Sequence, residues 1–189
     1  MFGGTEGVIR TRVGYAGGLK KNPRYHDLGD HTETINIIYD PKVVTFEKLL
    51  SLFWGNHNPS IPCQQQYKSV IFYHNKEQRI LAQHSLTISK QTSSSEINTE
   101  IHPANTFYVA ENYHQKYILQ QHPWLIVALQ IQTGEEFIKS HACSKLNGFL
   151  SCYYELEELP EIGKKLGLNE KMIQYINIQL KKSQYNFQK

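Results

Sequence analysis

Short apolar segments separated by polar turns predict a β-sheet in the first half of the chain. Residues 8–16 mix β-branched and aromatic side chains and run into a pair of glycines, as a strand does when it ends in a turn. Residues 33–39 place apolar side chains at alternate positions, which predicts a strand with one apolar face. Residues 67–73 are apolar on both faces, a pattern typical of a central strand covered on both sides. A shorter strand is predicted at residues 97–101.

Helical spacing and capping residues predict the elements that alternate with these strands. Thr45 has the residue type of an N-cap, and the apolar stripe that follows it at helical spacing runs to Trp54. Asn75 and Gln78 resemble a capping box, which predicts a helix from there to about Lys90. Further helices are predicted at residues 110–121, 155–165 and 169–182.

Together these elements predict an α+β fold in which helices pack on a mixed β-sheet. The length of 189 residues suits one domain with a small addition. We expect a first domain at residues 1–133. Residues 134–189 should form a mostly helical C-terminal extension, packed on that domain or tethered to it.

Composition narrows the class of protein. Hydrophobic residues make up 40% of the chain and charged residues 20%, which is enough apolar material for a packed core. The net charge of +3 is too small to indicate nucleic-acid binding, and no apolar stretch reaches the roughly 18 residues that a membrane span needs. Three cysteines cannot all pair with one another, which favours a reducing compartment. We therefore expect a cytoplasmic protein that binds neither nucleic acid nor membranes.

The long polar loop at residues 19–32 and the strand after it hold the first candidate chemistry, because long loops in compact domains are often functional. Glu33 has the same strand parity as Ile35 and Ile37, so we expect its carboxyl group on the buried side of the sheet. Loss of hydration there would favour the neutral acid, which can donate a proton. The alternative is a strand-end residue that leans into solvent.

Two tyrosines near this loop could offer phenol groups to a polar ligand. Tyr25 lies within the loop, and Tyr67 opens the predicted central strand. Taken alone, each fits a core or rim tyrosine better, because tyrosine commonly buries its ring and leaves its hydroxyl at a wet edge.

The same loop leaves a metal site open as an alternative. It is rich in ligand-type side chains, but no spacing typical of zinc occurs, and such clusters in polar loops are usually solvated. The side chains concerned are His26, Asp27, Asp30, His31 and Glu33.

Six short motifs follow one another along residues 1–120. They are Gly14-Tyr15-Ala16-Gly17-Gly18, Asn22-Pro23-Arg24-Tyr25, Asp30-His31-Thr32-Glu33, Leu52-Phe53-Trp54-Gly55-Asn56-His57, Gln66-Tyr67-Lys68-Ser69-Val70-Ile71-Phe72 and Ala110-Glu111-Asn112-Tyr113-His114-Gln115-Lys116-Tyr117. In this order they resemble the A-type peptide methionine sulfoxide reductases. One such motif would be weak support, whereas six in the family's order are specific. The resemblance implies that family's fold, a two-layer sandwich of helices and a mixed sheet.

The resemblance also implies a reaction and the side chains that carry it. In this family a cysteine thiolate attacks the sulfur of the S epimer of methionine sulfoxide, a glutamic acid protonates the departing oxygen, and two tyrosines bond that oxygen. By motif, Glu33 is the acid, while Tyr25 and Tyr67 bind the oxygen. Neutral donors of this kind can follow an oxygen that gains negative charge. The pocket-lining residues implied by the resemblance are Gly14, Tyr15 and His57.

One part of the family's pattern finds no match in these residues. The family nucleophile lies in a Gly-Cys-Phe-Trp-Gly motif that would precede Met1, so we expect the nucleophilic cysteine upstream and no turnover by the chain as given. Cys63 could approach the cleft, but nothing in the sequence places it at a helix N-terminus. Cys143 and Cys152 could be resolving thiols of a longer enzyme, although buried or incidental cysteines fit better.

The implied activity is thiol-dependent reduction of free or peptide methionine-S-sulfoxide to methionine, without a metal or a bound cofactor. The resemblance implies thioredoxin or another dithiol as reductant, oxidised proteins or peptides as substrates, and a monomeric enzyme. The alternative is a non-catalytic relative that binds methionine or its sulfoxide through the same cleft. Placement of Glu33 in bulk water, far from both tyrosines, would count against these interpretations.

Overall fold

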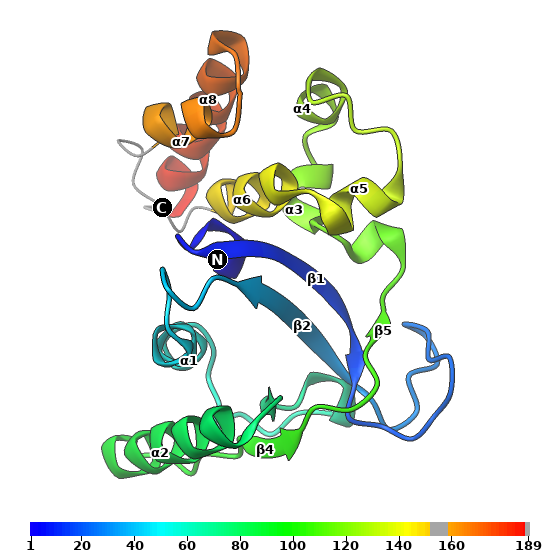
Figure 1. The fold of residues 1–189 in the computed structure, drawn as a ribbon, viewed down its shortest axis with the longest axis vertical. Helices are drawn as coiled ribbons and strands as arrows, with labels where there is room; N and C mark the ends of the chain where they lie inside the picture. Colours follow the sequence, from blue (N-terminus) through cyan, green and yellow to red (C-terminus); the bar gives the residue numbers. More distant parts are fainter. Residues whose placement is uncertain (152–158, 188–189) are drawn as a thin grey trace. The chain divides into compact units, whose positions relative to one another are not determined.

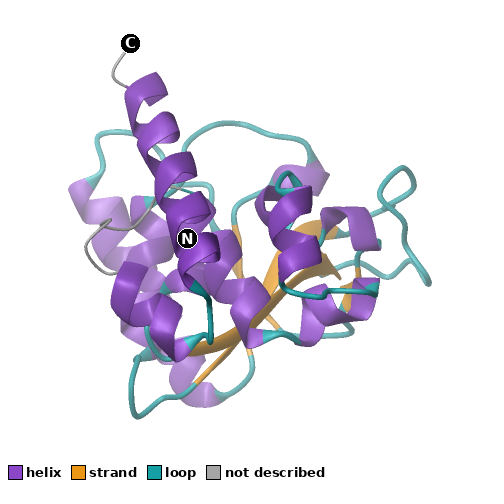
Figure 2. Cartoon of the chain, turned by 90° about the horizontal axis from the view of Figure 1, so that it is seen from above, coloured by secondary structure: helices purple, strands orange, loops and turns teal. Residues whose placement is uncertain are grey.

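The computed structural model describes residues 1–151 and 159–187 as a mixture of short strands and helices (Figures 1 and 2). The predicted α+β class is confirmed. The strands are β1 (Val8–Ala16), β2 (Thr32–Tyr39), β3 (Val70–Tyr73), β4 (Glu100–Pro103) and β5 (Tyr108–Val109). The α-helices are α1 (Phe46–Gly55), α2 (Lys76–Thr92), α3 (Tyr117–Gln120), α4 (Pro123–Ala128), α5 (Gly134–Lys139), α6 (His141–Leu150), α7 (Leu159–Lys165) and α8 (Glu170–Phe187). Short 3₁₀ helices are η1 (Phe2–Gly4), η2 (Gln65–Tyr67) and η3 (Asn112–His114).

Side-chain caps start the two helices predicted most clearly. Thr45 Oγ1 accepts a hydrogen bond from the Lys48 amide at 3.2 Å, at the first turn of α1. Asn75 Oδ1 accepts one from the Gln78 amide at 2.9 Å, at the first turn of α2. These bonds satisfy amides that have no partner within the helix. The strand at residues 8–16 and the helix at residues 169–182 are also confirmed, as β1 and α8.

The predicted central strand is wrong in its start and in its position. The strand begins at Val70, and Tyr67 belongs to η2, where the Lys68 amide closes a tight turn on the Gln65 carbonyl. Among the described residues β3 pairs only with β4, in parallel, with Val70 opposite Glu100. An apolar sequence on both faces therefore does not by itself require a strand neighbour on both edges.

The helix predicted at residues 110–121 is interrupted. Lys116 has a left-handed backbone, with φ 51°, and a right-handed helix cannot continue through such a residue. The segment is therefore split into η3 before Lys116 and α3 after it. The strand predicted at residues 97–101 forms a few residues later, as β4. Of the helix predicted at residues 155–165, the described part is α7, and residues 155–158 lie outside the described chain.

Strand pairing gives two small sheets. The first has the order β2-β1-β5, and β1 runs antiparallel to β5 with Gly14 opposite Val109. The second consists of β3 and β4. The chain divides into two compact units: the first unit comprises residues 1–12, 37–39 and 112–189, and the second unit comprises residues 13–36 and 40–111. The domain boundary expected at residue 133 stays a prediction.

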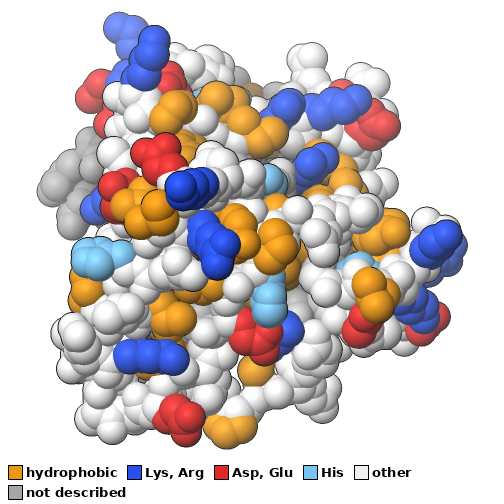
Figure 3. All heavy atoms as spheres, turned by 60° about the horizontal axis from the view of Figure 1, so that its bottom comes forward, with side chains coloured by type: hydrophobic (Ala, Val, Ile, Leu, Met, Phe, Trp, Pro, Cys, Tyr) orange, Lys and Arg blue, Asp and Glu red, His pale blue; other side chains and the backbone are white. Residues whose placement is uncertain are grey.

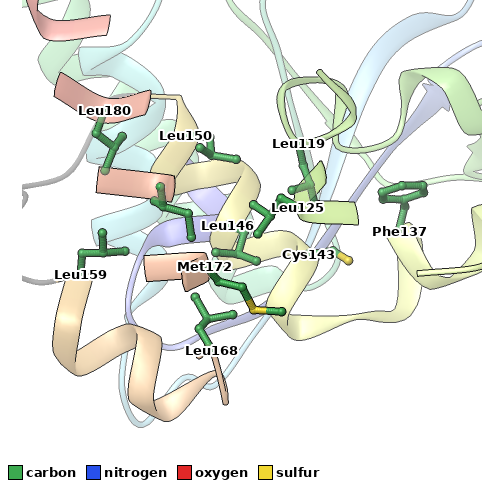
Figure 4. Close-up of a cluster of buried hydrophobic side chains, with 11 residues drawn as sticks. Leu119, Leu125, Phe137, Cys143, Leu146, Leu150, Leu159, Leu168, Met172 and Leu180 are labelled. Carbon is green, nitrogen blue, oxygen red and sulfur yellow. The ribbon is translucent and has the colours of Figure 1, made fainter. Parts of the chain in front are cut away.

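The first unit has a leucine-rich core, drawn in Figure 4. Leu146 and Leu150 lie one turn apart on α6, as Ile176 and Leu180 do on α8, so each pair lies on one helix face. All four side chains are buried, and burial of each stabilises the fold by about 1.5–3 kcal/mol. Other helices of the unit complete the core with Leu119, Leu125, Phe137 and Leu159.

Close backbone contact fastens η1 to α6 within this unit. A Cβ placed on Gly148 would lie 2.3 Å from the Gly4 nitrogen, so only glycine fits there without a shift of the backbone. The neighbouring Lys145 donates hydrogen bonds from Nζ to the carbonyls of Gly4, at 3.0 Å, and Thr5, at 2.5 Å. The ammonium group thus satisfies carbonyls that end the short helix η1.

Surface charge and helix composition are relevant to the expectation that the protein binds neither nucleic acid nor membranes. Acidic and basic side chains alternate on the face shown in Figure 3, rather than gathering into a patch of one sign. No helix within residues 1–151 and 159–187 is both long enough and apolar enough to cross a membrane.

Gly148→Ala should lower the free energy of unfolding by about 1–3 kcal/mol, because its methyl group meets backbone that no side-chain rotation can move. Urea unfolding measures the loss. Gly55→Ala is the matched control, since a Cβ at this position of α1 meets nothing within 4 Å. It should leave stability unchanged or raise it slightly, as alanine favours helix over glycine. Equal unfolding midpoints for both variants would contradict the close contact.

Lys116 should make stability depend on pH in the alkaline range. The side chain is only 5% exposed, its Nζ donates to the Thr11 carbonyl at 2.6 Å, and burial lowers its pKa to about 8. Between that value and the higher pKa of the unfolded chain, the unfolded state binds a proton that the folded state does not. Stability from this group therefore rises with pH through that window, by at most about 3 kcal/mol.

Lys116→Met removes this ionisation while keeping an unbranched apolar stem. The unfolding free energy of the parent chain, measured by urea unfolding at each pH, should rise steadily relative to that of the variant from pH 7.5 to pH 10. A difference that stays constant over this range would show that the ammonium is hydrated in the folded state.

Candidate functional site

The loop between β1 and β2 is closed at its base by two adjacent side chains. Asp30 accepts backbone hydrogen bonds from Leu19, at 2.8 Å, and Lys20, at 3.2 Å, and these bonds lower its pKa. His31 is 1% exposed; its Nδ1 accepts from the Gly18 amide at 3.2 Å, and its Nε2 donates to the Lys20 carbonyl at 2.8 Å. Because an amide can only donate and a carbonyl can only accept, the His31 tautomer with its proton on Nε2 satisfies both contacts.

This closure requires glycine at position 18. A Cβ on Gly18 would lie 2.5 Å from Asp30 Oδ1 and 2.7 Å from the His31 backbone nitrogen. Any larger residue would push the two closing side chains away from the backbone groups that they bind. The Gly17-Gly18 pair therefore serves close approach as well as the turn that its sequence predicts.

The structure brings Tyr25, Glu33 and Tyr67 together within the second unit. Tyr25 lies in a turn closed by a hydrogen bond from the Asp27 amide to the Arg24 carbonyl, at 2.8 Å. Its side chain is hydrogen-bonded to that of Tyr67, and this bond raises the pKa of Tyr67, with smaller contributions from desolvation, from the charge of Tyr25 and, last, from that of Glu33. Tyr67 is 54% exposed, so its side chain is open to a ligand from solvent.

Glutamine side chains tie η2, which carries Tyr67, to the loop and to β2. Gln65 Nε2 donates to the Asp30 carbonyl at 2.9 Å, and the Gln65 carbonyl accepts from the buried Thr32 hydroxyl at 3.0 Å. Gln66 Nε2 donates to Glu33 Oε1 at 2.6 Å. The neighbouring residues Gln65 and Gln66 therefore hold both the helix that carries Tyr67 and the side chain of Glu33.

The expectation that Glu33 points to a dry side of the sheet is wrong. Its side chain is exposed, and Ile35 on the same face of β2 is 40% exposed. Strand parity assigns residues to a face, but burial needs another element to cover that face, and at this end of β2 the described residues supply none. Glu33 nevertheless lies close enough to Tyr67 to affect its ionisation.

Two of the three predicted pocket residues belong to the contact between β1 and β5. A Cβ on Gly14 would lie 2.2 Å from the Tyr108 carbonyl oxygen, so this glycine allows the strands to approach. Tyr15 is 2% exposed, and its hydroxyl donates to Glu111 Oε2 at 2.6 Å. Their predicted role as pocket residues stays a prediction.

His57, the third predicted pocket residue, lies just after α1. Its Nδ1 donates to the Phe53 carbonyl at 2.7 Å, and its Nε2 is 2.8 Å from the Ser69 hydroxyl. The Ser69 hydroxyl in turn lies 2.8 Å from that of Thr99. These bonds link the end of α1 to the segments that lead into β3 and β4; contact of His57 with a substrate stays a prediction.

The described cysteines differ in access. Cys63 is a free, exposed thiol in the loop before η2. Cys143, in α6, is free and only 1% exposed, and burial raises its pKa, which disfavours the thiolate. Cys152 lies outside the described residues, so the resolving role considered for these two cysteines stays a prediction.

The alternative metal site finds no support in the part of the chain that the structure describes, where no three His, Cys, Asp or Glu side chains are placed to hold an ion. The candidate ligands have other partners: Asp27 pairs with Lys20, Asp30 binds backbone amides, and both His31 nitrogens are occupied.

Glu111 is a site residue to which sequence reasoning gave no role. Its Oε1 accepts a hydrogen bond from the Tyr25 amide at 3.1 Å, while Oε2 binds Tyr15. Its place in the Ala110–Tyr117 motif could have indicated a role. An acidic residue just after a strand can also reach a neighbouring loop. Gln65 and Gln66 were likewise overlooked, since an amide in a polar segment has no pattern that predicts its partner.

Comparisons with known proteins agree on one family. The family model described as peptide methionine sulfoxide reductase matches residues 1–146. A peptide methionine sulfoxide reductase of Drosophila melanogaster is 41% identical over 178 residues, covering 93% of this chain and 72% of the relative. Peptide methionine sulfoxide reductase A5 of Arabidopsis thaliana is 41% identical over 155 residues, and the match spans 78% of this chain but only 61% of that protein.

A solved structure agrees with these relatives. Methionine sulfoxide reductase A of Corynebacterium diphtheriae superposes with a TM-score of 0.57 at 32% sequence identity. The superposition covers 65% of this chain and 68% of that one.

Tyr25→Phe should lower the pKa of Tyr67 towards its ordinary value, because it removes the hydrogen bond that contributes most to the increase. The measurement is a pH titration by NMR of protein labelled with ¹³C at the tyrosine Cζ, with the Tyr67 signal assigned from Tyr67→Phe. Tyr73→Phe, in β3, is the control for loss of a phenol elsewhere in the second unit. An identical Tyr67 titration in Tyr25→Phe and the parent chain would show that the two hydroxyls do not bond in solution.

Proposed function

The chain belongs to the peptide methionine sulfoxide reductase family, oxidoreductases that return methionine sulfoxide to methionine, and we propose that its Tyr25–Glu33–Tyr67 cluster acts on the S epimer. The observation that carries the proposal is the meeting of two hydrogen-bonded phenols and a carboxyl group in one compact unit. These three residues come from separate segments of the chain: a loop, the strand β2 and the 3₁₀ helix η2.

The phenols suit the sulfoxide oxygen. That oxygen carries negative charge and accepts hydrogen bonds, and its charge grows as the bond to sulfur breaks. The raised pKa keeps Tyr67 protonated at neutral pH, so the hydrogen-bonded pair retains a hydroxyl proton that it can donate to this oxygen. Methionine, which lacks the oxygen, offers them no acceptor of comparable strength. We therefore propose that the pair distinguishes the sulfoxide from the thioether.

Glu33 is the proposed proton donor for the departing oxygen. Its Oε1 is held by Gln66, and among the residues described Gln66 is the only hydrogen-bond partner of this carboxyl group. Oε2 therefore stays available to a ligand. The overall reaction balances with two thiols: the oxygen leaves as water, the methionine sulfur becomes a thioether, and the two thiol sulfurs end as a disulfide.

The thiols are the part of the reaction that these side chains do not provide. Cys143 is buried, and its raised pKa argues against its use as the attacking thiolate. Cys63 is exposed and reaches solvent. We propose thioredoxin or another dithiol as the reductant, oxidised proteins and peptides as substrates, and the cytoplasm as the place of action of a monomer without a metal. Free thiols at Cys63 and Cys143 are compatible with that reducing environment.

The proposal is tested first by binding and then by turnover. N-acetyl-methionine-(S)-sulfoxide methylamide is titrated into the chain and its dissociation constant is measured by NMR, with the matching thioether as comparison. Tyr67→Phe and Tyr25→Phe should each weaken binding of the sulfoxide by about 2–10-fold, the value of one hydrogen bond, without affecting the thioether. Equal binding of sulfoxide and thioether by the parent chain would refute the proposed site.

Reduction of the sulfoxide is then measured by chromatography. The reductant is first dithiothreitol and then thioredoxin with its reductase. Glu33→Gln keeps the size of the side chain but cannot donate the proton, and should lower any observed rate by about 10²–10⁴-fold. Glu47→Gln, an exposed acidic residue in the first turn of α1, is the matched control and should keep the parent rate. Cys63→Ser shows whether that thiol takes part. Selective sulfoxide binding with no reduction under either condition would instead favour the non-catalytic binding relative.

A further inference from the structure

Glu111 joins two segments that are far apart in the sequence. Its Oε2 accepts the Tyr15 hydroxyl proton at 2.6 Å, and its Oε1 accepts the Tyr25 amide proton at 3.1 Å. The partners lie 96 and 86 residues from Glu111 along the chain. Both oxygens of one carboxylate are therefore in use, which fixes the rotation of the group as well as its position.

The sheet provides the rigid side of this connection. Tyr15 is buried in β1 and pairs with Tyr108 of β5. Just beyond β5 the Ala110 amide donates to the Val13 carbonyl at 3.1 Å, so the backbone is held up to the residue before Glu111. Tyr15, Ala110 and Leu28 form a buried cluster on which the Tyr25 side chain packs.

The loop between β1 and β2, which carries Tyr25, has to be held in place relative to this sheet. Asp30 and His31 bind backbone groups of residues 18–20, at the base of the loop. The turn at Tyr25 lies farther out and is closed by the local bonds between Arg24 and Asp27. A local turn sets the shape of the backbone but does not fix its position relative to the sheet. The bond from the Tyr25 amide to Glu111, together with the packing of the Tyr25 side chain on Tyr15 and Ala110, ties the turn to the sheet.

We propose that Glu111 is a positioning residue for the sulfoxide-binding pair: its carboxylate anchors the Tyr25 backbone to the sheet and so sets the Tyr25 hydroxyl against that of Tyr67. The inference rests on the proposed function of the two phenols. Glu111 binds the Tyr25 backbone amide, so it acts on the placement of the residue rather than on the phenol. The same proposal explains why a carboxylate is needed, since it can accept from both tyrosines at once, whereas an amide has one acceptor oxygen.

The test uses the titration of Tyr67 as a readout that a purely structural role would not move. In Glu111→Ala the Tyr67 pKa should fall towards its ordinary value, as it does in Tyr25→Phe, because the phenols no longer meet. Glu111→Gln keeps the size of the side chain and one of the two bonds, so its Tyr67 titration should fall between those of the parent and the alanine variant. It also carries the test if Glu111→Ala does not fold.

Glu136→Gln is the matched control. The Glu136 Oε2 atom accepts hydrogen bonds from two loop amides, those of Gln132 at 2.6 Å and Thr133 at 3.3 Å, but it lies in the first unit. Its loss should lower the thermal midpoint without changing the Tyr67 titration. Affinity for the S-sulfoxide ligand should fall by about 2–10-fold in Glu111→Ala, the loss expected for Tyr25→Phe, and stay within 2-fold of the parent in Glu136→Gln.

The two proposals fail in different ways. If the parent chain does not prefer the sulfoxide over the thioether, the proposed function fails, yet the response of Tyr67 to Glu111 substitution still decides the positioning role. If Glu111→Gln lowers only the thermal midpoint and leaves both the Tyr67 titration and the affinity of a binding-competent chain unchanged, Glu111 is structural and the inference is overturned.

Discussion

The site depends on hydrogen bonds between side chains and the backbone of a polar loop, because this part of the backbone belongs to no strand or helix. Residues 18–20 have no ladder partner, so their amides and carbonyl bind the side chains of Asp30 and His31 instead. This closure brings the two ends of the loop together beside β2. The outer part of the loop is held separately, by the Tyr25 amide bond to Glu111 and by packing of Leu28 and Tyr25 on Tyr15 and Ala110.

The other half of the site is assembled by the same kind of bond. Gln65 binds the Asp30 carbonyl with its side chain and the Thr32 hydroxyl with its backbone, so the short helix η2 is seated on the end of the closed loop. Tyr67 is two residues farther on. Tyr67 is thus fixed by contacts made through neighbouring residues rather than by packing of its ring in a core, which agrees with its exposure.

Sequence patterns predicted what is encoded locally. Thr45 and Asn75 could be recognised as caps because the bond each makes lies within its own first helical turn. Tyr25, Glu33 and Tyr67 could be brought into one hypothesis only through family motifs, since no periodicity relates a loop, a strand and a 3₁₀ helix. Lys116 broke a predicted helix because its left-handed backbone goes with a buried bond to Thr11, 105 residues away. The exposure of Glu33 was missed for a related reason, because cover over a strand face is a tertiary property.

The imidazole of His31 serves two different backbone groups from one buried position. Its Nδ1 accepts from the Gly18 amide, and its Nε2 donates to the Lys20 carbonyl. A side chain that could only donate or only accept would leave one of these groups without a partner in a place closed to water. The base of the loop would then loosen, and the Tyr25 turn would lose part of its support although no residue of the turn itself had changed.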